Sequence, residues 1–199
     1  MRPNKKKLKS LILYIFQRYN NQKLTETKLQ KLLYFCDFGY FQEANKSITG
    51  FQYRKNRFGP TIIDLPQILK QMKKEGLINI LEGSNYFGSP QKTFSIVNPE
   101  VLPEGDFSKS ELLVIDRINE AYEKLTPREI TSISHVDFPY LATKKMGQGI
   151  NYKLTHYREE PGEDLGLEDQ EAVDYFTSSS FASLMNKVSH RLQQVSNGN

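Results

Sequence analysis

The side chains in this sequence that could take part in catalysis are few and widely spaced. The three histidines, His135, His156 and His190, lack the paired spacing of a zinc-binding helix. The single cysteine, Cys36, could be imagined in a nucleophilic site with His135 and Asp137, but it lies inside an apolar helical pattern, where a cysteine is usually inert packing. Phosphate-loop, dinucleotide-binding and nucleophile-elbow motifs are missing. We therefore expect that the protein is not an enzyme, and that it has no catalytic residue and binds no metal or cofactor.

A basic and aromatic stretch is the best candidate for contact with another molecule. Its members are Tyr53, Arg54, Lys55, Arg57, Phe58, Gly59 and Pro60. Aromatic and arginine side chains dominate interface energetics, because they bury area at low entropic cost and add cation–π or bidentate contacts. The last three residues have two interpretations. They form a turn that orients two helices, or they belong to a recognition surface.

A second candidate region lies around residues 134–140. In one interpretation His135 is structural, donating to the free carbonyl groups at a helix end while Asp137 caps the next turn. In the other, His135, Pro139 and Tyr140 line a groove that receives a partner peptide. The residues alone leave both interpretations open.

The elements that position these residues are predicted to be mainly helices. Apolar residues at helical spacing predict one helix over residues 8–19. Thr25 is a suitable N-cap for a second, central helix that is apolar around most of its circumference. Capping boxes that begin at Ser108 and Thr126 predict two further helices.

A helix followed by a β-hairpin is predicted between these parts of the chain. The helix is expected to begin between Thr61 and Pro66 and to end at Gly76. Two β-like segments, 77–81 and 93–97, are joined by a turn-rich loop, and residues 51–55 alternate briefly like a short strand. The fold class is therefore mainly α, of the α+β kind: a compact helical domain with a small β-hairpin or short antiparallel sheet.

Net charge is distributed unevenly along the chain. Residues 1–75 carry 16 lysines and arginines against 5 acidic residues, a balance of +11, whereas residues 76–199 carry a balance of −7. A basic half can attract nucleic acid or an acidic partner surface at an enhanced rate. The alternative is that the two halves face each other and water.

The composition, 38% hydrophobic and 25% charged, is that of an ordinary globular protein. A single cysteine suits a reducing cytoplasm. No apolar run approaches the roughly 18 residues that a spanning helix needs, so we expect no membrane contact.

Three motifs, in this order and rough spacing, resemble the Panacea domain of SocA-like antitoxins. They are Thr27-Lys28-Leu29-Gln30-Lys31-Leu32-Leu33-Tyr34, Phe58-Gly59-Pro60 and Ser134-His135-x-Asp137-x-Pro139-Tyr140. The resemblance covers about residues 25–157. The sequence departs from the family pattern at Tyr140, where the family often has tryptophan.

The resemblance implies a bacterial or prophage antitoxin, mainly helical with a small β element. Such a protein inactivates a toxin encoded by an adjacent gene through direct complex formation. Family toxins often arrest translation and include toxic relatives of small alarmone synthetases, and one family member instead acts as an adaptor that delivers its toxin to a protease. Further oligomerisation of the complex stays open.

The resemblance also suggests a division of the chain. A Panacea domain is expected over residues 1–158, with its core over about 25–157. An acidic linker would follow over 159–177, where eight of the first sixteen residues are acidic. A C-terminal helix over 178–195 and a tail over 196–199 would complete the chain.

A winged-helix DNA-binding regulator is the rival hypothesis. Helices from Thr25 and Thr61, followed by the hairpin, imitate a helix-turn-helix with a wing, and the basic half provides affinity for phosphate. Against it, the second helix carries its lysines, at 70, 73 and 74, only at the C-terminal end, whereas recognition helices usually contact bases with N-terminal residues. The wing has a single lysine, Lys92. Nucleic acid is therefore possible as a partner but not favoured.

Overall fold

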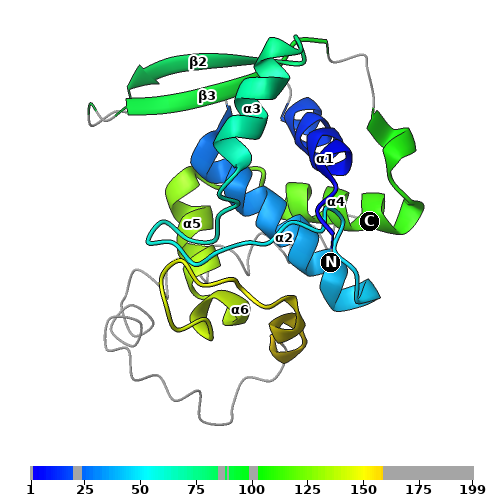
Figure 1. Ribbon diagram of the computed structural model, residues 1–199, viewed down its shortest axis with the longest axis vertical. Coiled ribbons are helices and arrows are strands. Elements are labelled where there is room, and N and C mark those ends of the chain that lie inside the picture. The colour runs from blue at the N-terminus through cyan, green and yellow to red at the C-terminus, as the bar shows by residue number, and fades with distance from the viewer. Residues whose placement is uncertain (1, 20–23, 85–87, 89, 99–102, 159–199) are drawn as a thin grey trace. The chain divides into compact units, whose positions relative to one another are not determined.

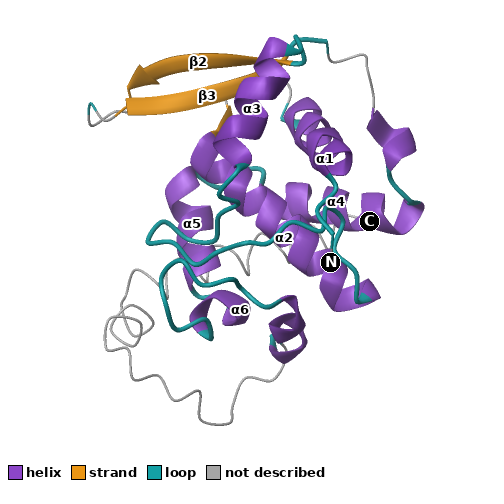
Figure 2. Ribbon diagram, in the orientation of Figure 1, coloured by secondary structure: helices purple, strands orange, loops and turns teal. Residues whose placement is uncertain are grey.

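The central helix of the protein is packed against other helices on several sides. The computed structural model describes residues 2–19, 24–84, 88, 90–98 and 103–158, and Met1–His156 form one compact unit. Within these residues the architecture is mainly α with one small antiparallel sheet, as the sequence predicts (Figures 1 and 2). The predicted acidic linker, C-terminal helix and tail lie outside the described residues.

Helix α2, Glu26–Ala44, lies at the centre of the unit. Thr25 caps it by accepting a hydrogen bond from the Lys28 N–H at 3.2 Å, and Asn45, with φ of 54°, ends it in the left-handed conformation. Figure 1 shows α2 with α1 and α4 on one side and α5 on the other. The helix is buried around most of its circumference, because apolar side chains occupy most of its faces.

Helix α1, Lys5–Arg18, contributes fully buried side chains to the core. Among them, Leu8, Leu11 and Ile15 are each 0% exposed. The hydrophobic core therefore includes residues that precede the predicted boundary at about residue 25. The N-terminus of α1 is capped by Asn4, whose side chain accepts from the Lys7 N–H at 3.0 Å.

Helix α3, Leu65–Lys74, precedes the β-hairpin. It begins within the predicted interval and ends before Gly76, whose φ of +71° suits a glycine at a helix C-terminus. Strands β2, Ile78–Ser84, and β3, Pro90–Ile96, pair with Ile80 opposite Phe94. The short strand β1, Leu24–Thr25, pairs with the other edge of β3 and gives the order β1-β3-β2.

The hairpin strands extend further than the sequence indicates. The predicted connecting loop covered residues 82–92, but strand pairing continues to Ser84 opposite Pro90. These outer residues are mostly exposed, so no apolar alternation marks them, and their pairing depends on backbone hydrogen bonds. The predicted loop was therefore too long.

Helices α4, Lys109–Tyr122, and α5, Pro127–His135, begin where the capping boxes predict. In both boxes the hydroxyl of the N-cap accepts from a backbone N–H, and the glutamate three residues later accepts from the N-cap N–H. Helix α6, Phe138–Leu141, and the 3₁₀ helices η1, Pro103–Asp106, and η2, Tyr152–Tyr157, complete the described elements.

The predicted strand at residues 51–55 is extended backbone without a regular ladder. Arg54 forms single bridges with Thr61 and with Gly149. The alternation in the sequence therefore predicted an extended segment correctly, but this segment forms isolated bridges and not a regular β-strand.

Part of the uneven charge along the chain is matched by ion pairs between its two halves. Lys6 pairs with Asp106 at 2.8 Å, Lys7 with Glu111 at 2.5 Å, and Arg18 with Asp116 at 2.7 Å. These pairs support the interpretation in which the two halves face each other. No helix among the described residues combines the length and apolarity needed to cross a bilayer.

Candidate functional site

Two extended segments lie side by side and present the predicted basic and aromatic stretch. The Lys55 N–H donates to the Gln148 carbonyl at 2.9 Å, and the Gly147 N–H donates back to the Lys55 carbonyl at 2.8 Å. The Arg54 side chain crosses between the segments and donates to the Gly147 carbonyl at 2.8 Å. The backbone of the stretch is therefore held by a neighbouring segment about 90 residues later in the chain.

Arg57 and Phe58 form an exposed pair at the tip of this stretch. Phe58 is 57% exposed, and the guanidinium carbon of Arg57 lies 4.4 Å from the centroid of its ring. Arg54 and Arg57 are also exposed. A large apolar ring in water beside a stacked cation is a feature typical of interaction surfaces.

Tyr53 does not belong to that exposed surface, contrary to the sequence prediction. Its side chain is 0% exposed, and its hydroxyl donates to the Asp37 carboxylate at 2.9 Å. Residues alternate in direction along an extended segment, so Tyr53 faces the core while Arg54 faces water.

Gly59 and Pro60 form a closely packed turn between helices. Gly59 has φ of +89°, and a Cβ added there would lie 2.6 Å from both Lys31 Cε and Ser134 Oγ. The Lys31 ammonium donates to the Pro60 carbonyl at 3.1 Å. The turn therefore does orient helices α2 and α5, and both its conformation and its packing require glycine.

Lys31 is the functional candidate that sequence reasoning did not single out. Its side chain is 1% exposed, and burial lowers its pKa to about 7. It belongs to the first of the three motifs, which predicts its helix but not its burial. The nearly complete apolar circumference of α2 was the available signal, because a lysine on such a helix has little access to water.

His135 ends helix α5 and stacks on Tyr140. The ring centroids are 5.0 Å apart with 29° between the planes. Burial first, and then the charges of Lys31 and Lys55, lower the pKa of His135 to about 4. The imidazole is therefore neutral at pH 7, and its Nε2 is buried without a hydrogen-bond partner among the described residues.

Pro139 and Tyr140 are buried, so they do not line an open groove by themselves. The Tyr140 hydroxyl donates to the Asn56 carbonyl at 2.8 Å, and Lys55 Nζ lies 4.8 Å from its ring centroid. The two candidate regions, around residues 53–60 and 134–140, are therefore in contact through Tyr140.

Asp137 does not cap α6 through its side chain, as one interpretation of the sequence expected. Its carboxylate instead accepts from the Tyr34 hydroxyl at 2.5 Å. This contact joins the beginning of α6 to the central helix.

A pocket of about 510 Å³ lies between α2, the turn and the β-hairpin. Its walls include Gln30 and Lys31 of α2, Asn56 and Phe58 of the turn, and Glu82 and Lys92 of the hairpin. Gln30 is fixed by the Ile62 N–H, which donates to its side-chain oxygen at 2.9 Å. The pocket therefore combines an exposed aromatic ring, amide side chains and a buried ammonium group.

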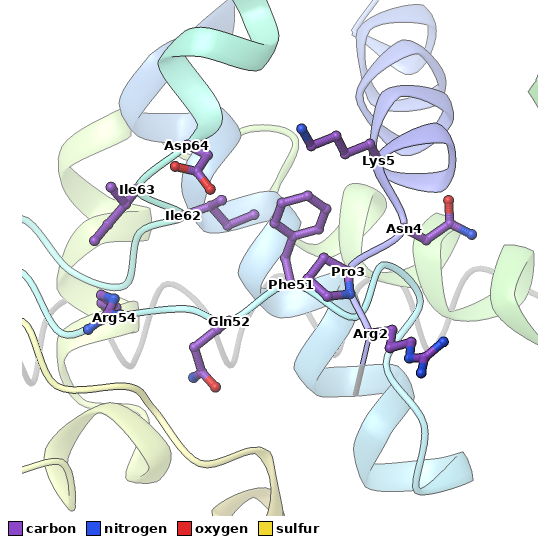
Figure 3. Close-up of a pocket in the computed structure, with 10 residues that line it drawn as sticks. All are labelled: Arg2, Pro3, Asn4, Lys5, Phe51, Gln52, Arg54, Ile62, Ile63 and Asp64. Atoms are coloured by element: carbon purple, nitrogen blue, oxygen red, sulfur yellow. The ribbon is translucent and has the colours of Figure 1, made fainter.

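A larger pocket, of about 830 Å³, lies on the other side of Arg54. Figure 3 shows its lining side chains, which come from the N-terminal residues 2–5, from 51–54 and from 62–64. Its charged members are Arg2, Lys5, Arg54 and Asp64, so basic side chains outnumber acidic ones in a lining that is otherwise uncharged.

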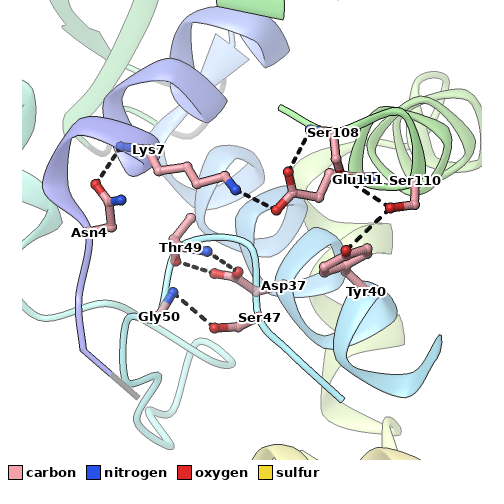
Figure 4. Close-up of polar contacts among 10 residues, drawn as sticks. All are labelled: Asn4, Lys7, Asp37, Tyr40, Ser47, Thr49, Gly50, Ser108, Ser110 and Glu111. Carbon is pink, nitrogen blue, oxygen red and sulfur yellow. Dashed lines mark hydrogen bonds and ion pairs between the residues drawn. The ribbon is translucent and has the colours of Figure 1, made fainter. Parts of the chain in front are cut away.

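A buried polar cluster holds the loop that leads into the site. Asp37 of α2 accepts from the Thr49 N–H at 2.7 Å and from the Thr49 hydroxyl, as Figure 4 shows. The Asn4 N–H donates to the Thr49 carbonyl at 2.8 Å. Burial raises the pKa of Asp37 to about 6, although its hydrogen bonds favour the charged form. The cluster therefore fixes both the loop and the N-terminus against α2.

Of the side chains considered for catalysis, Cys36, His135, Asp137 and His156 belong to the described residues, and His190 lies outside them. Cys36 is fully buried in α2, and burial raises the pKa of its thiol, which makes it unreactive. Across the described ranges, no group of three or more histidine, cysteine or acidic residues is arranged to hold a metal ion.

Comparison with known proteins identifies one family. A family model described as "Antitoxin SocA-like, Panacea domain" matches residues 29–138, more than half of the 199-residue chain. No curated protein matches the chain. The matched residues run from α2 to the beginning of α6, and they include Lys31, the turn and His135.

Proposed function

The chain belongs to the SocA-like antitoxin family with a Panacea domain, and from this premise we propose that it neutralises a protein toxin by binding it directly. The toxin is the product of an adjacent gene, and a toxin that arrests translation, such as a toxic relative of the small alarmone synthetases, fits the expectation from the sequence. The role is that of a cytoplasmic binding protein and not of an enzyme.

The exposed surface formed by Arg54, Arg57 and Phe58 is the observation that supports a direct contact. Phe58 offers apolar area without the need to unfold any part of the protein. The two arginines can pair with carboxylates of a partner, and Arg57 is already oriented by its contact with Phe58. Since the backbone behind them is held by residues 147–150, the surface is preorganised for binding.

Co-expression tests the proposal. The adjacent gene product alone should stop growth, and the wild-type protein should restore it and co-purify with the toxin. Phe58→Ala and Arg57→Glu should weaken both rescue and co-purification, because each removes an exposed contact while the core stays intact.

Arg128→Glu is the matched control for Arg57→Glu. Arg128 is an exposed arginine near the beginning of α5, at the opposite end of that helix from His135. Arg128→Glu changes the net charge by the same amount as Arg57→Glu, and it should leave rescue unchanged. Equal rescue by wild type, Phe58→Ala and Arg57→Glu would remove this surface from the proposal.

Delivery of the toxin to a protease is a variant of the same function. It predicts that the toxin disappears from cells that contain the antitoxin and a protease, whereas occlusion leaves a stable complex. Pulse-chase labelling of the toxin, with and without the antitoxin, separates the two modes.

A DNA-binding regulator is the second candidate, and the order of elements favours it. Helices α2 and α3 followed by the β2–β3 hairpin reproduce the helix, helix and wing order. The exposed face of α3 is polar and basic, with Gln67, Lys70 and Lys74. Against this candidate, residues 45–64 separate the two helices, whereas a helix-turn-helix has a turn of only about 3–4 residues.

Binding of duplex DNA by the isolated protein tests the second candidate. A regulator should bind with an affinity that falls steeply with salt concentration, and Lys70→Glu should weaken it. An antitoxin that acts only through protein contact should show no such salt-dependent affinity.

A further inference from the structure

Lys31 is a buried lysine without an acidic partner among the residues that the structure describes. Its ammonium group donates to the Pro60 carbonyl at 3.1 Å, and none of the ion pairs found within the described residues includes it. Burial of an ammonium group without an anionic partner destabilises a folded protein. A bound anion would remove much of that penalty.

Lys31 is one of the residues that line the pocket between α2, the turn and the hairpin, although it is only 1% exposed. Lys31 itself forms part of the pocket wall, together with Gln30, Asn56 and Phe58. Gln30 uses its side-chain oxygen to accept from Ile62, so what remains on its amide is an N–H donor. An ammonium group, an amide donor and an aromatic wall suit a carboxylate at the end of a short apolar stem.

We propose that a carboxylate of the toxin, from an aspartate or glutamate side chain, enters this pocket and pairs with Lys31. This inference rests on the proposed function, because the carboxylate belongs to the bound toxin. The pocket and the exposed surface then have separate roles. Arg54, Arg57 and Phe58 make solvent-exposed contacts with the toxin, whereas Lys31 forms a buried ion pair with it.

The charged side chains that line the pocket are two carboxylates, Glu26 and Glu82, and two ammonium groups, Lys31 and Lys92. On the hairpin, Glu82 pairs with Lys92 at 3.6 Å, so that pair contributes little net charge, and Glu26 lies at the beginning of α2. His135 of α5 and Lys55 of the turn region lie on the side of the site that packs against Tyr140. Burial is the cause that lowers the pKa of Lys31 to about 7, with no carboxylate acting to raise it.

Proton uptake is a specific signature of the proposed ion pair. Without the toxin, much of Lys31 is neutral above pH 7, because burial lowers its pKa to about 7. A carboxylate beside it raises that pKa again, so the complex takes up a proton. The uptake is expected between about pH 7.5 and 9, between the free and the paired pKa values.

The experiment compares wild type, Lys31→Met and Lys28→Met in complex formation with the adjacent gene product. Isothermal titration calorimetry at pH 8 in two buffers of different ionisation enthalpy gives both the affinity and the protons taken up. Lys31→Met should bind about 10- to 100-fold more weakly, the loss typical of a charge-assisted contact. It should also take up less than the wild-type number of protons.

Lys28→Met is the matched control. Lys28 is a second buried lysine of α2, but its ammonium donates to the Glu123 carbonyl at 2.6 Å and lies 4.6 Å from the Tyr19 ring centroid. It does not line the pocket around Lys31. Its substitution should leave affinity and proton uptake at the wild-type values.

The results separate this inference from the proposed function. Wild-type affinity and wild-type proton uptake in Lys31→Met would overturn the inference while leaving the antitoxin role intact. Absence of any complex with wild-type protein would overturn the proposed function itself. A double-mutant cycle between Lys31→Met and Asp→Asn or Glu→Gln changes in the toxin should identify one carboxylate with strongly non-additive effects.

Discussion

Lys28 and Lys31 show two ways in which one helix can bury an ammonium group. Lys28 lies over an aromatic ring and donates to a main-chain carbonyl at the end of α4. Lys31 donates a hydrogen bond to the Pro60 carbonyl and lines a pocket. Burial lowers both pKa values, to about 8 and about 7. Of the two, only Lys31 lines the pocket between α2 and the hairpin.

Substitution of Lys31 by methionine should stabilise the free protein. The lysine pKa is about 7 in the folded state and about 10.4 in the unfolded state, so the unfolded state binds more protons between these values. Wild-type stability therefore gains from a rise in pH over this window. Lys31→Met should be more stable by about 1–4 kcal/mol at pH 7, and the difference should shrink towards pH 9.5.

Urea unfolding of both proteins at several pH values measures this difference. A variant that is less stable than wild type at pH 7 would mean that the Pro60 contact outweighs the cost of burial. That outcome would also weaken the argument that Lys31 needs an anionic partner beyond those that the described residues supply.

Asp37 should produce a pH dependence in the opposite direction. Its pKa is about 6 when folded, against about 3.9 when unfolded, so the folded state binds more protons between pH 4 and 6. Its contribution to stability therefore falls as pH rises through this window. Relative to wild type, Asp37→Asn should gain stability from pH 4 to 6 and show a constant difference above about pH 7. Thermal unfolding across this range, with Asp64→Asn as an exposed control, measures it.

At this scale the sequence predicted residue types better than residue directions. The basic and aromatic composition around Arg57 was enough to find the exposed surface. The burial of Tyr53 and Lys31 depends on packing against Asp37 and Pro60, which are 16 and 29 residues away in the sequence. Such contacts leave no local pattern.

At the scale of elements, the turn at Gly59 connects three parts of the fold. A side chain there would meet Lys31 of α2 and Ser134 of α5, so the turn packs closely against both helices. The same turn places Phe58 on the surface and Lys31 in the pocket wall. Its geometry therefore determines both parts of the proposed toxin contact.

Gly59→Ala should destabilise the protein more than Gly76→Ala. Both glycines have positive φ, of +89° and +71°, so each substitution incurs about 1–2 kcal/mol of backbone strain. At Gly76 an added Cβ meets nothing within 4 Å, whereas at Gly59 it meets two side chains at 2.6 Å. We expect an additional loss of about 1–3 kcal/mol for Gly59→Ala in denaturant unfolding. Equal losses would show that Lys31 and Ser134 move aside easily.

Elements with a local chemical signal were predicted well. The N-caps at Thr25, Ser108 and Thr126 each satisfy a backbone N–H within three residues, so sequence neighbours are sufficient to specify them. The outer parts of the hairpin and the pairing of residues 53–55 with 147–150 depend on distant backbone groups. No side-chain pattern identifies such partners in advance.

At the scale of the whole molecule, α1 is part of the domain although it precedes the family match. Leu11→Ala should lower the free energy of unfolding by about 2–5 kcal/mol, because Leu11 is 0% exposed and the substitution leaves a cavity in the core. Leu113→Ala is the matched control, since Leu113 is 72% exposed, and should change stability by less than about 0.5 kcal/mol. Urea unfolding of both variants measures the difference. Similar small losses would place α1 outside the cooperative unit.

The ion pairs between the two halves of the chain also affect how the protein is made. Lys6 and Lys7 are synthesised 100 and 104 residues before their acidic partners, Asp106 and Glu111. Until those partners leave the ribosome, Lys6 and Lys7 lack the carboxylates with which they pair in the folded protein, whereas α2 and β3, which also contact α1, have already been synthesised. A polypeptide whose translation halts before Asp106 would therefore retain Lys6 and Lys7 without either of these ion pairs.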